Sequence, residues 1–490
     1  MANARFDNLN AVKRVDLTAI QTSQTVRVNA RDEVAKILAC SVESSATSCE
    51  CLQGEGVVNG RTNVKILYLD QTGDVCSANC NADFATTMQG AIAPNCCMQA
   101  FVNVLETKSN AFGNVISVDV LLEISSSVYV PQEITAFVDG DMFIKREDRD
   151  VATKVDCAKI CGEIEQELQT AQAIQRVLLA DSVVCVSDFV VNEGIASVQG
   201  KATVNLAYFN EQTLFESFTF DFSQEFVASN LSDSAHNTVW VEVKNTKIRL
   251  DVVEGEANNT LVAEIVLCFN VLQMETQTMS VIVDAYDKSS QLHFSTCDLQ
   301  TVLPCGNARV DKRVSHLLPQ EMAGGILHVS NKRVVVSGVE SVDGGVKVEG
   351  VICFDMLSRS DDNYFITPIQ MPFVENLDVD FVANGCVAQV NACVKGVTVS
   401  HSNGLKVDAD VQFCIMGQML SQFAVITNVV EAPLPEIDSY AIEISIANKG
   451  DTLWDLAKNL KLSQEEVLAI NPEIASPLEE STKIVAYNKL

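Results

Sequence analysis

The seventeen cysteines are the side chains with the clearest chemical potential in this sequence. Two close pairs, Cys49 with Cys51 and Cys76 with Cys80, could bind zinc because soft thiolates suit this ion. Zinc-binding pairs usually leave about two to four residues between the cysteines, and residues 1–150 contain no histidine. We therefore expect no metal ion and no other cofactor. Three roles stay open for the cysteines: a weak zinc site, oxidative cross-links, and buried thiols.

Catalytic chemistry has no recognisable pattern in the sequence. The histidines are scattered, and none stands in H-E-x-x-H or another metal-binding spacing. The sequence contains no Walker A loop, no G-x-S-x-G and no G-x-G-x-x-G. Cys157 and Cys161 stand one turn apart on a predicted helix, which suits neither a redox motif nor a disulfide. We predict that the protein is not an enzyme.

The charge of the chain limits its partners. Lys+Arg 34 against Asp+Glu 64 gives a formal net charge of −30, which disfavours nucleic acid and anionic lipid surfaces. The N-terminal residues lack an apolar h-region, so we expect no secretory signal and a cytoplasmic location. Residues 411–430 carry no charge, but glutamines interrupt them, and we predict two successive strands there rather than a membrane span.

The elements that must position any site repeat along the chain. Three blocks, VVNGRTNVKILYLD (57–70), SVQGKATVNLAYFN (197–210) and KVEGVICFDMLSRS (347–360), each place a glycine before an alternation of apolar and polar residues. The glycines are Gly60, Gly200 and Gly350. Alternation with period two, abundant Val, Ile and Thr, and turn sequences between the runs predict antiparallel sheets that form sandwiches or barrels. Residues 159–180 predict the clearest helix of this region.

These repeats predict a mainly β chain of tandem domains. The expected segments are a lead-in (1–30), a first β domain (31–150), a linker helix with a second β domain (151–295), a third β domain (296–431), a proline-containing linker (432–439), and a small terminal domain (440–490). The linker contains two prolines, Pro433 and Pro435, two positions apart, which prevents regular helix or sheet pairing.

The terminal domain changes from strands to helices. Residues 442–447 alternate as a short strand, and two capping-box patterns, Thr452 with Asp455 and Ser463 with Glu466, predict the starts of two short helices. Pro472 ends the second helix, and TKIVAY predicts a closing strand. Each helix is shorter than the roughly 12–15 residues that are stable alone, so both must pack on the strand pair.

This strand–helix–helix–strand order, with GDTLWDLA, INPEI and KIVAY, resembles the LysM domain. In that family, the loop before the first helix and the loop after the second form a shallow groove that binds N-acetylglucosamine polymers. The resemblance implies a partner- or glycan-binding groove made by Gly450, Asp451, Thr452, Leu453, Trp454, Asn471, Pro472, Glu473 and Ile474. The family's closing glycine run is replaced here by SPLEESTKIVAY, which adds Glu479 and Glu480.

The upstream blocks resemble the SPOCS domain of spore-forming Clostridia, through the glycine-containing strand and the long strand that follows it. SPOCS repeats followed by one LysM domain are the layout of the SipL-like spore morphogenesis proteins, in which the LysM domain binds a coat-anchoring ATPase. The resemblance implies a non-enzymatic scaffold of the spore coat, cytoplasmic in the mother cell and placed at the forespore surface, with self-association as a further expectation. The alternatives are a peptidoglycan-binding protein and a structural coat protein stabilised by thiols or zinc.

Overall fold

The structure is a computed structural model and describes residues 4–250, 259–318, 325–360, 363–382, 385–400, 405–434 and 442–487. Apart from two short helices near the C-terminus, the described elements are β-strands in antiparallel sheets. The prediction of a mainly β protein is therefore confirmed.

The first six strands form one unit with two three-stranded sheets. One sheet has the order β1-β6-β5 and the other has the order β2-β3-β4. The strands are β1 (Arg5–Asn29), β2 (Val34–Leu52), β3 (Glu55–Asp70), β4 (Val75–Gln89), β5 (Cys97–Phe112) and β6 (Val115–Asp139). The predicted lead-in of residues 1–30 is thus mostly strand β1, which pairs with β6 and belongs to the first unit.

The next twelve strands repeat this topology twice, with the orders β7-β12-β11 and β8-β9-β10, then β13-β18-β17 and β14-β15-β16. The second unit contains β7 (Phe143–Gln169), β8 (Arg176–Asn192), β9 (Ile195–Asn210), β10 (Gln212–Val227), β11 (His236–Leu250) and β12 (Thr260–Tyr286). The third contains β13 (Ser290–Leu318), β14 (Gly325–Val342), β15 (Gly345–Ser360), β16 (Asn363–Asp378), β17 (Cys386–Ser400) and β18 (Leu405–Pro433). Each unit encloses its own apolar core.

The predicted helix at residues 159–180 is wrong, because this segment lies in β7 and β8 and the turn between them. In the part that belongs to β7, the buried residues are Ile160, Ile164 and Leu168. Their spacing of four residues fits a helix face, but four is also an even number, so it fits one face of a strand equally well. Pairing with β12 along the whole of β7 decides between the two.

The three repeated glycines lie in the central strand of a sheet, each beneath an aromatic ring of the neighbouring strand. The pairs are Gly60 with Phe84, Gly200 with Phe222, and Gly350 with Phe373. A Cβ on Gly60 would lie 2.1 Å from the ring of Phe84. These glycines therefore make room for a ring that covers the strand, which explains why the pattern recurs in all three units.

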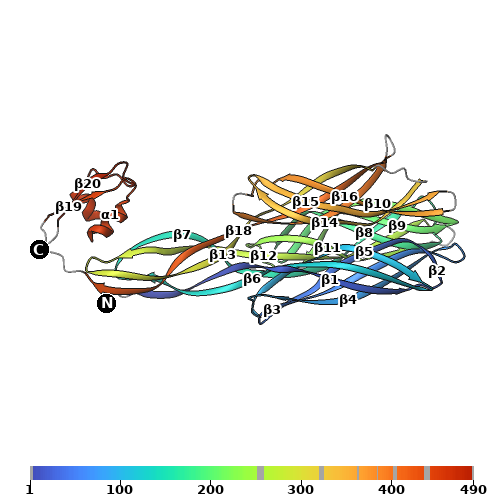
Figure 1. The fold of residues 1–490 in the computed structure, drawn as a ribbon, viewed down its shortest axis with the longest axis horizontal. Helices are drawn as coiled ribbons and strands as arrows, with labels where there is room; N and C mark the ends of the chain where they lie inside the picture. Colours follow the sequence, from blue (N-terminus) through green and yellow to red (C-terminus); the bar gives the residue numbers. More distant parts are fainter. Residues whose placement is uncertain are drawn as a thin grey trace.

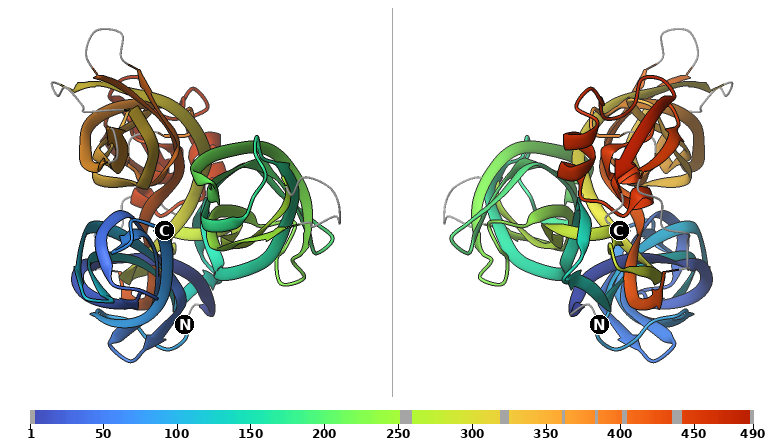
Figure 2. Two further views of the ribbon diagram at one scale, coloured as in Figure 1. Left: turned by 90° about the vertical axis from the view of Figure 1, so that its right-hand side faces the viewer. Right: turned by 90° about the vertical axis from the view of Figure 1, so that its left-hand side faces the viewer.

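The first and last strands of each unit pair with each other and run on beyond the rest of the sheets as long two-stranded ribbons. In Figure 1 the three ribbons extend together toward one end of the molecule, and in Figure 2 the three units lie around a common axis. One buried cluster takes a residue from each ribbon strand: Ala11, Ala136, Val151, Val281, Leu299 and Val425. The ribbons thus form a stalk with its own apolar seam.

Residues 411–430, predicted as two strands, are part of the single strand β18. Glutamines of this stretch hydrogen-bond to side chains of other strands: Gln418 donates to the hydroxyl of Tyr129 at 2.9 Å and accepts from Arg14 at 2.7 Å. Within the described ranges, no helix has the length and apolar character that crossing a bilayer would require.

The terminal module has the predicted order of elements, with β19 (Ile442–Ala447), α1 (Leu453–Leu460), α2 (Gln464–Ile470) and β20 (Thr482–Tyr487). Strands β19 and β20 pair antiparallel. Of the predicted linker 432–439, residues 432–433 still belong to β18, and residues 435–439 lie outside the described residues.

The repeated glycine gives a test of the sheet packing. We expect Gly200→Ala to lower the free energy of unfolding by about 1–3 kcal/mol, because the added Cβ would lie 2.4 Å from the carbonyl oxygen of Cys185. Gly396→Ala is the matched control, since its Cβ would meet nothing within 4 Å. Urea unfolding followed by circular dichroism measures both variants, and equal midpoints would contradict the packing argument.

Candidate docking surface on the terminal module

Both helices of the module begin at capping boxes, as predicted. The hydroxyl of Thr452 accepts from the backbone N–H of Asp455 and the Asp455 carboxylate accepts from the N–H of Thr452. Ser463 and Glu466 make the same exchange at the start of α2. Hydrogen bonds to Thr452 hold the pKa of Asp455 below its usual value. These caps satisfy N–H groups that neither helix can satisfy internally.

The two predicted groove loops lie next to each other. The N–H of Gly450 donates to the carbonyl of Leu478 at 2.9 Å, and the N–H of Leu478 donates to the carbonyl of Asp451 at 3.0 Å. The N–H of Leu453 donates to the hydroxyl of Ser476 at 2.9 Å. The loop before α1 and the loop after α2 therefore form one continuous surface.

The residues of the second loop have different roles. Pro472 and Glu473 are exposed, and Ile474 is half-buried against the module core. Asn471 is structural: its amide donates to the carbonyl of Val485 at 2.8 Å, and its side-chain oxygen accepts from the N–H of Val485 at 2.9 Å. Asn471 thus joins the end of α2 to β20.

Trp454 does not line the groove. Its ring is 7% exposed and makes an edge contact with Tyr286, with 5.0 Å between the ring centroids. Its indole N–H donates to the carboxylate of Asp284 at 2.8 Å. The predicted groove role of Trp454 is therefore corrected: this ring joins the module to the end of β12 at the tip of the stalk. The residue belongs to an interface within the chain.

Further contacts hold the module on the stalk tip. The ammonium of Lys458 lies 2.7 Å from the Asp284 carboxylate, and the hydroxyl of Tyr286 donates to the carbonyl of Leu462 at 2.7 Å. Lys288 pairs with Glu466. The Tyr286 ring also stacks on Phe143 of β7, at 4.8 Å between centroids. The stalk tip therefore meets α1 and the start of α2, and Gly450, Pro472 and Glu473 stay exposed.

The outer face of the module's sheet carries an apolar stripe. Ile442, Ile444 and Ile446 of β19 are exposed, with Ile446 at 77%. The helices cover the opposite face, where Ala447, Ile484 and Ala486 are buried. Two of these three residues are alanines, which let α1 and α2 approach the strands, and the isoleucines of β19 face outward.

The candidate zinc cysteines do not form a common site. Burial raises the pKa of Cys49 and of Cys51 to about 11, which keeps both as thiols. In the described ranges, the only group of three possible ligand side chains combines Cys76 with Asp32 and Asp70. The Asp70 carboxylate already accepts from Thr72 and from the N–H of Asp74. Neither Cys80 nor the first pair joins this group.

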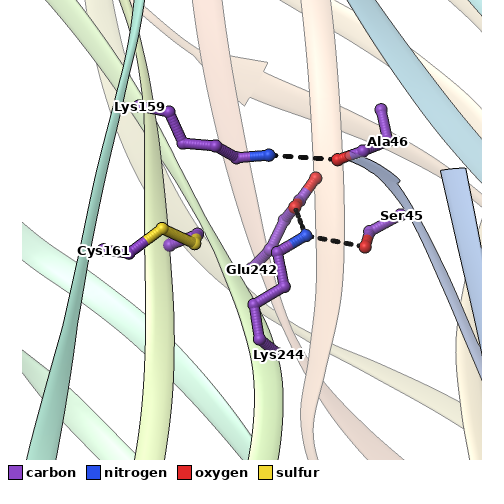
Figure 3. The surroundings of a disulfide bond; sticks show 7 residues. Ser45, Ala46, Lys159, Cys161, Glu242 and Lys244 are labelled. Carbon is purple, nitrogen blue, oxygen red and sulfur yellow. Dashed lines mark hydrogen bonds and ion pairs between the residues drawn. A yellow bond between two sulfur atoms is a disulfide. The ribbon is translucent and has the colours of Figure 1, made fainter. Parts of the chain in front are cut away.

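Cys157 and Cys161 are not bonded to each other, but each forms a disulfide with another cysteine, so oxidative cross-links, one of the three roles left open for the cysteines, occur at these two positions. Cys97 is bonded to Cys157, which joins β5 of the first unit to β7 of the second, and Cys161 is bonded to Cys268 across β7 and β12. On a strand rather than a helix, each cysteine faces a different partner. Figure 3 shows Cys161 beside the contacts between the first two units.

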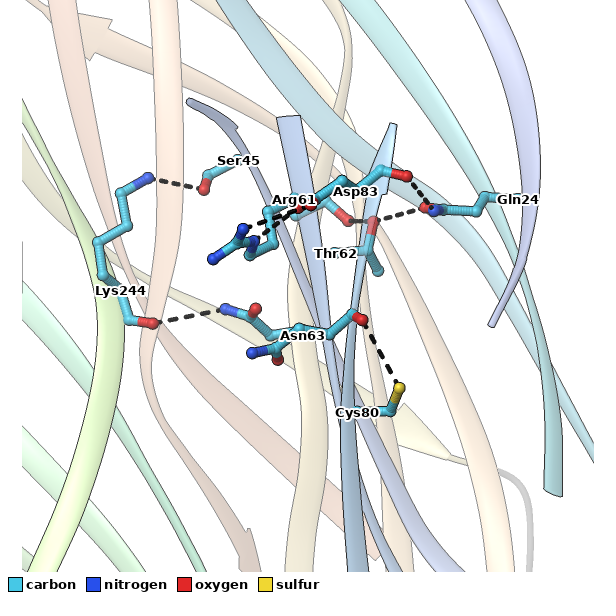
Figure 4. A network of polar contacts seen from close by, with 10 residues as sticks. Gln24, Ser45, Arg61, Thr62, Asn63, Cys80, Asp83 and Lys244 are labelled. Atoms are coloured by element: carbon cyan, nitrogen blue, oxygen red, sulfur yellow. Dashed lines mark hydrogen bonds and ion pairs between the residues drawn. The ribbon is translucent and has the colours of Figure 1, made fainter. Parts of the chain in front are cut away.

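A polar cavity of about 280 Å³ lies where the three units meet, lined mainly by the second and fifth strands of each unit. Lys244 donates to Ser45 at 2.7 Å and Asn63 donates to the carbonyl of Lys244 at 3.5 Å, as Figure 4 shows. Burial raises the pKa of Glu43 to about 6, and burial lowers the pKa of Lys332. Such mixed charge suits bound water and small polar solutes rather than an apolar ligand.

Comparison of the chain with protein-family models, with curated proteins and with solved structures found no match.

The contact between Trp454 and Tyr286 can be tested by fluorescence. In a Trp240→Phe background Trp454 is the remaining tryptophan. We expect Tyr286→Ala to shift its emission to longer wavelength, because the indole loses the ring that covers it. Tyr487→Ala, which removes a 55% exposed ring of β20, is the control and should leave the emission unchanged. Unchanged emission in both variants would show that the module does not rest on the stalk.

The ion pair at the same contact predicts an acid dependence. Lys288, with the cap at Ser463, lowers the pKa of Glu466 from 4.5 to about 2. A lowered carboxyl pKa stabilises the folded contact above pH 4.5, and this contribution is lost as the pH falls toward about 2. In the same Trp240→Phe background, the Trp454 emission should change as the pH is lowered. Lys288→Ala should move the midpoint of this change toward pH 4.5. Lys108→Ala, which removes an exposed ion pair with Glu106, should not move it.

Proposed function

We propose that the protein is a non-enzymatic scaffold that docks a protein partner through the groove loops of its terminal module during assembly of a spore envelope. The observation that carries this proposal is the orientation of the module. Trp454, Lys458 and Glu466 face the stalk, while Gly450, Pro472 and Glu473 are exposed. A firmly held module with free loops at one end of a long body suits a docking role better than a catalytic one.

The chemistry of the loops favours a basic partner. Glu473, Glu479 and Glu480 are exposed, as is Pro472, and Ile474 of the same closing segment is half-buried. Apolar and acidic residues exposed on one segment match a partner surface that offers apolar and basic side chains. The overall charge of −30 adds long-range attraction for such a partner.

The likeness of the module to LysM domains and of the three units to SPOCS domains supports a more specific partner, a coat-anchoring ATPase. It also supports a place at the forespore surface, on the mother-cell side. The topology common to all three units is consistent with tandem copies of one domain, which such scaffolds contain. Their lateral surfaces would then serve self-association.

Binding of peptidoglycan or another N-acetylglucosamine polymer is the second candidate, because the hydrogen bonds between Asp451 and Leu478 and between Leu453 and Ser476 join both groove loops into one surface. Three exposed glutamates around that surface do not improve binding of a neutral sugar. Calorimetry with chitooligosaccharide separates the two functions: the scaffold proposal expects no heat of binding, and a saturable signal would favour the glycan.

A charge reversal tests the docking proposal directly. We expect Glu473→Lys to weaken binding of the full chain to the purified coat-anchoring ATPase about tenfold, or about 1.4 kcal/mol. Glu225→Lys makes the same charge change at an exposed position of β10 and is the matched control. Biolayer interferometry measures both. Equal affinities for the two variants, or full affinity after removal of residues 435–490, would contradict the proposal.

A further inference from the structure

The boundary between the second and third units brings two free cysteines together. Cys185 lies on β8 of the second unit and Cys393 lies on β17 of the third, 208 positions apart in sequence. Their Sγ atoms are 3.3 Å apart, in direct contact and without a covalent bond. The first and second units are already joined at their own boundary by the disulfide between Cys97 and Cys157.

The surroundings of this thiol pair favour its oxidation. The hydrogen bond with Cys393 lowers the pKa of Cys185 and, with a smaller contribution from the charge of Lys395, outweighs the opposing effect of burial. The same hydrogen bond and burial raise the pKa of Cys393. Lys395 pairs with Asp311 at 2.7 Å. One sulfur of the pair is therefore the better nucleophile, and the other keeps the proton.

A cavity between the units gives a small oxidant access to the pair. Cys393 lines the polar cavity of about 280 Å³ at the meeting point of the three units. Cys185 is buried next to it, at 6% exposure. A third thiol, Cys414 of β18, lies near both cysteines. Burial raises the pKa of Cys414, so it competes poorly as a nucleophile.

We propose that Cys185 and Cys393 form an oxidation site, at which a peroxide converts the two thiols into a disulfide between the second and third units. The Cys185 thiolate attacks one peroxide oxygen, the O–O bond breaks, and a sulfenic acid and one water form after proton transfer. The sulfur of Cys393 then attacks the Cys185 sulfur, loses its proton, and displaces a second water. Two thiols and one peroxide thus give one disulfide and two waters, and the peroxide takes up two electrons.

The consequence concerns the whole body of the molecule. Before oxidation the first two units are joined by Cys97–Cys157, while noncovalent contacts and the turn from β12 to β13 join the second and third. After oxidation all three units are covalently cross-linked. Exposure to peroxide would thereby make it harder to pull the third unit away from the second.

Mass spectrometry of the full chain tests the proposal. The purified protein is treated with hydrogen peroxide, its remaining thiols are alkylated, and it is digested without reduction. We expect a peptide pair joined through Cys185 and Cys393 that is absent before peroxide. Absence of this pair, with sulfinic acid on Cys185 or a link from Cys185 to Cys414, would overturn the proposal.

Substitution of single cysteines tests which thiols form the cross-link. Cys393→Ser should abolish the cross-linked pair and leave a sulfenic acid on Cys185 that dimedone labels. Cys414→Ser and Cys297→Ser, the latter at an exposed cysteine of β13, are controls and should leave the pair unchanged. Loss of the pair in the Cys414→Ser control would show that Cys414 takes part in the step, which contradicts the assignment of Cys393.

Discussion

The apolar seam between the three ribbons is the interaction on which the rest of this structure depends. Each ribbon pairs the first strand of a unit with its last, and the seam takes one small or branched side chain from each of the six strands. A second cluster, which includes Val12, Val155 and Met416, continues the seam toward the body. This seam aligns the three ribbons, and the aligned ribbons carry the tip on which the module rests.

The sequence predicted the local structure of the units better than their assembly. Alternation and turns predicted the strands, and the repeated glycines marked the central strand of each unit, where Phe84 and its equivalents need space. The ribbons could not be predicted, because Arg5 pairs with Asp139 and no local pattern records such a distant partner. The false helix at residues 159–180 has the same origin, since only pairing with β12 distinguishes its spacing from that of a helix.

The same division holds for the candidate site. Capping boxes and helix ends follow from residues three positions apart, so the module could be predicted from its own sequence. The role of Trp454 could not, because its partner Asp284 lies 170 positions earlier. The contact between Cys185 and Cys393 likewise depends on how two units meet. Features that depend on residues close in sequence could thus be predicted, whereas contacts between distant elements could be identified only from the structure.

Lysine cross-linking of the intact chain tests most directly whether the ribbons carry the module as a fixed part. Lys458 bonds to Asp284, and Lys288 bonds to the neighbouring Glu466, so these two ammonium groups lie at the same contact. A short lysine-reactive reagent, followed by mass spectrometry, should join Lys458 mainly to Lys288. Links from Lys458 spread over remote lysines of the body, such as Lys201 and Lys347, would show a tethered module and would contradict this account.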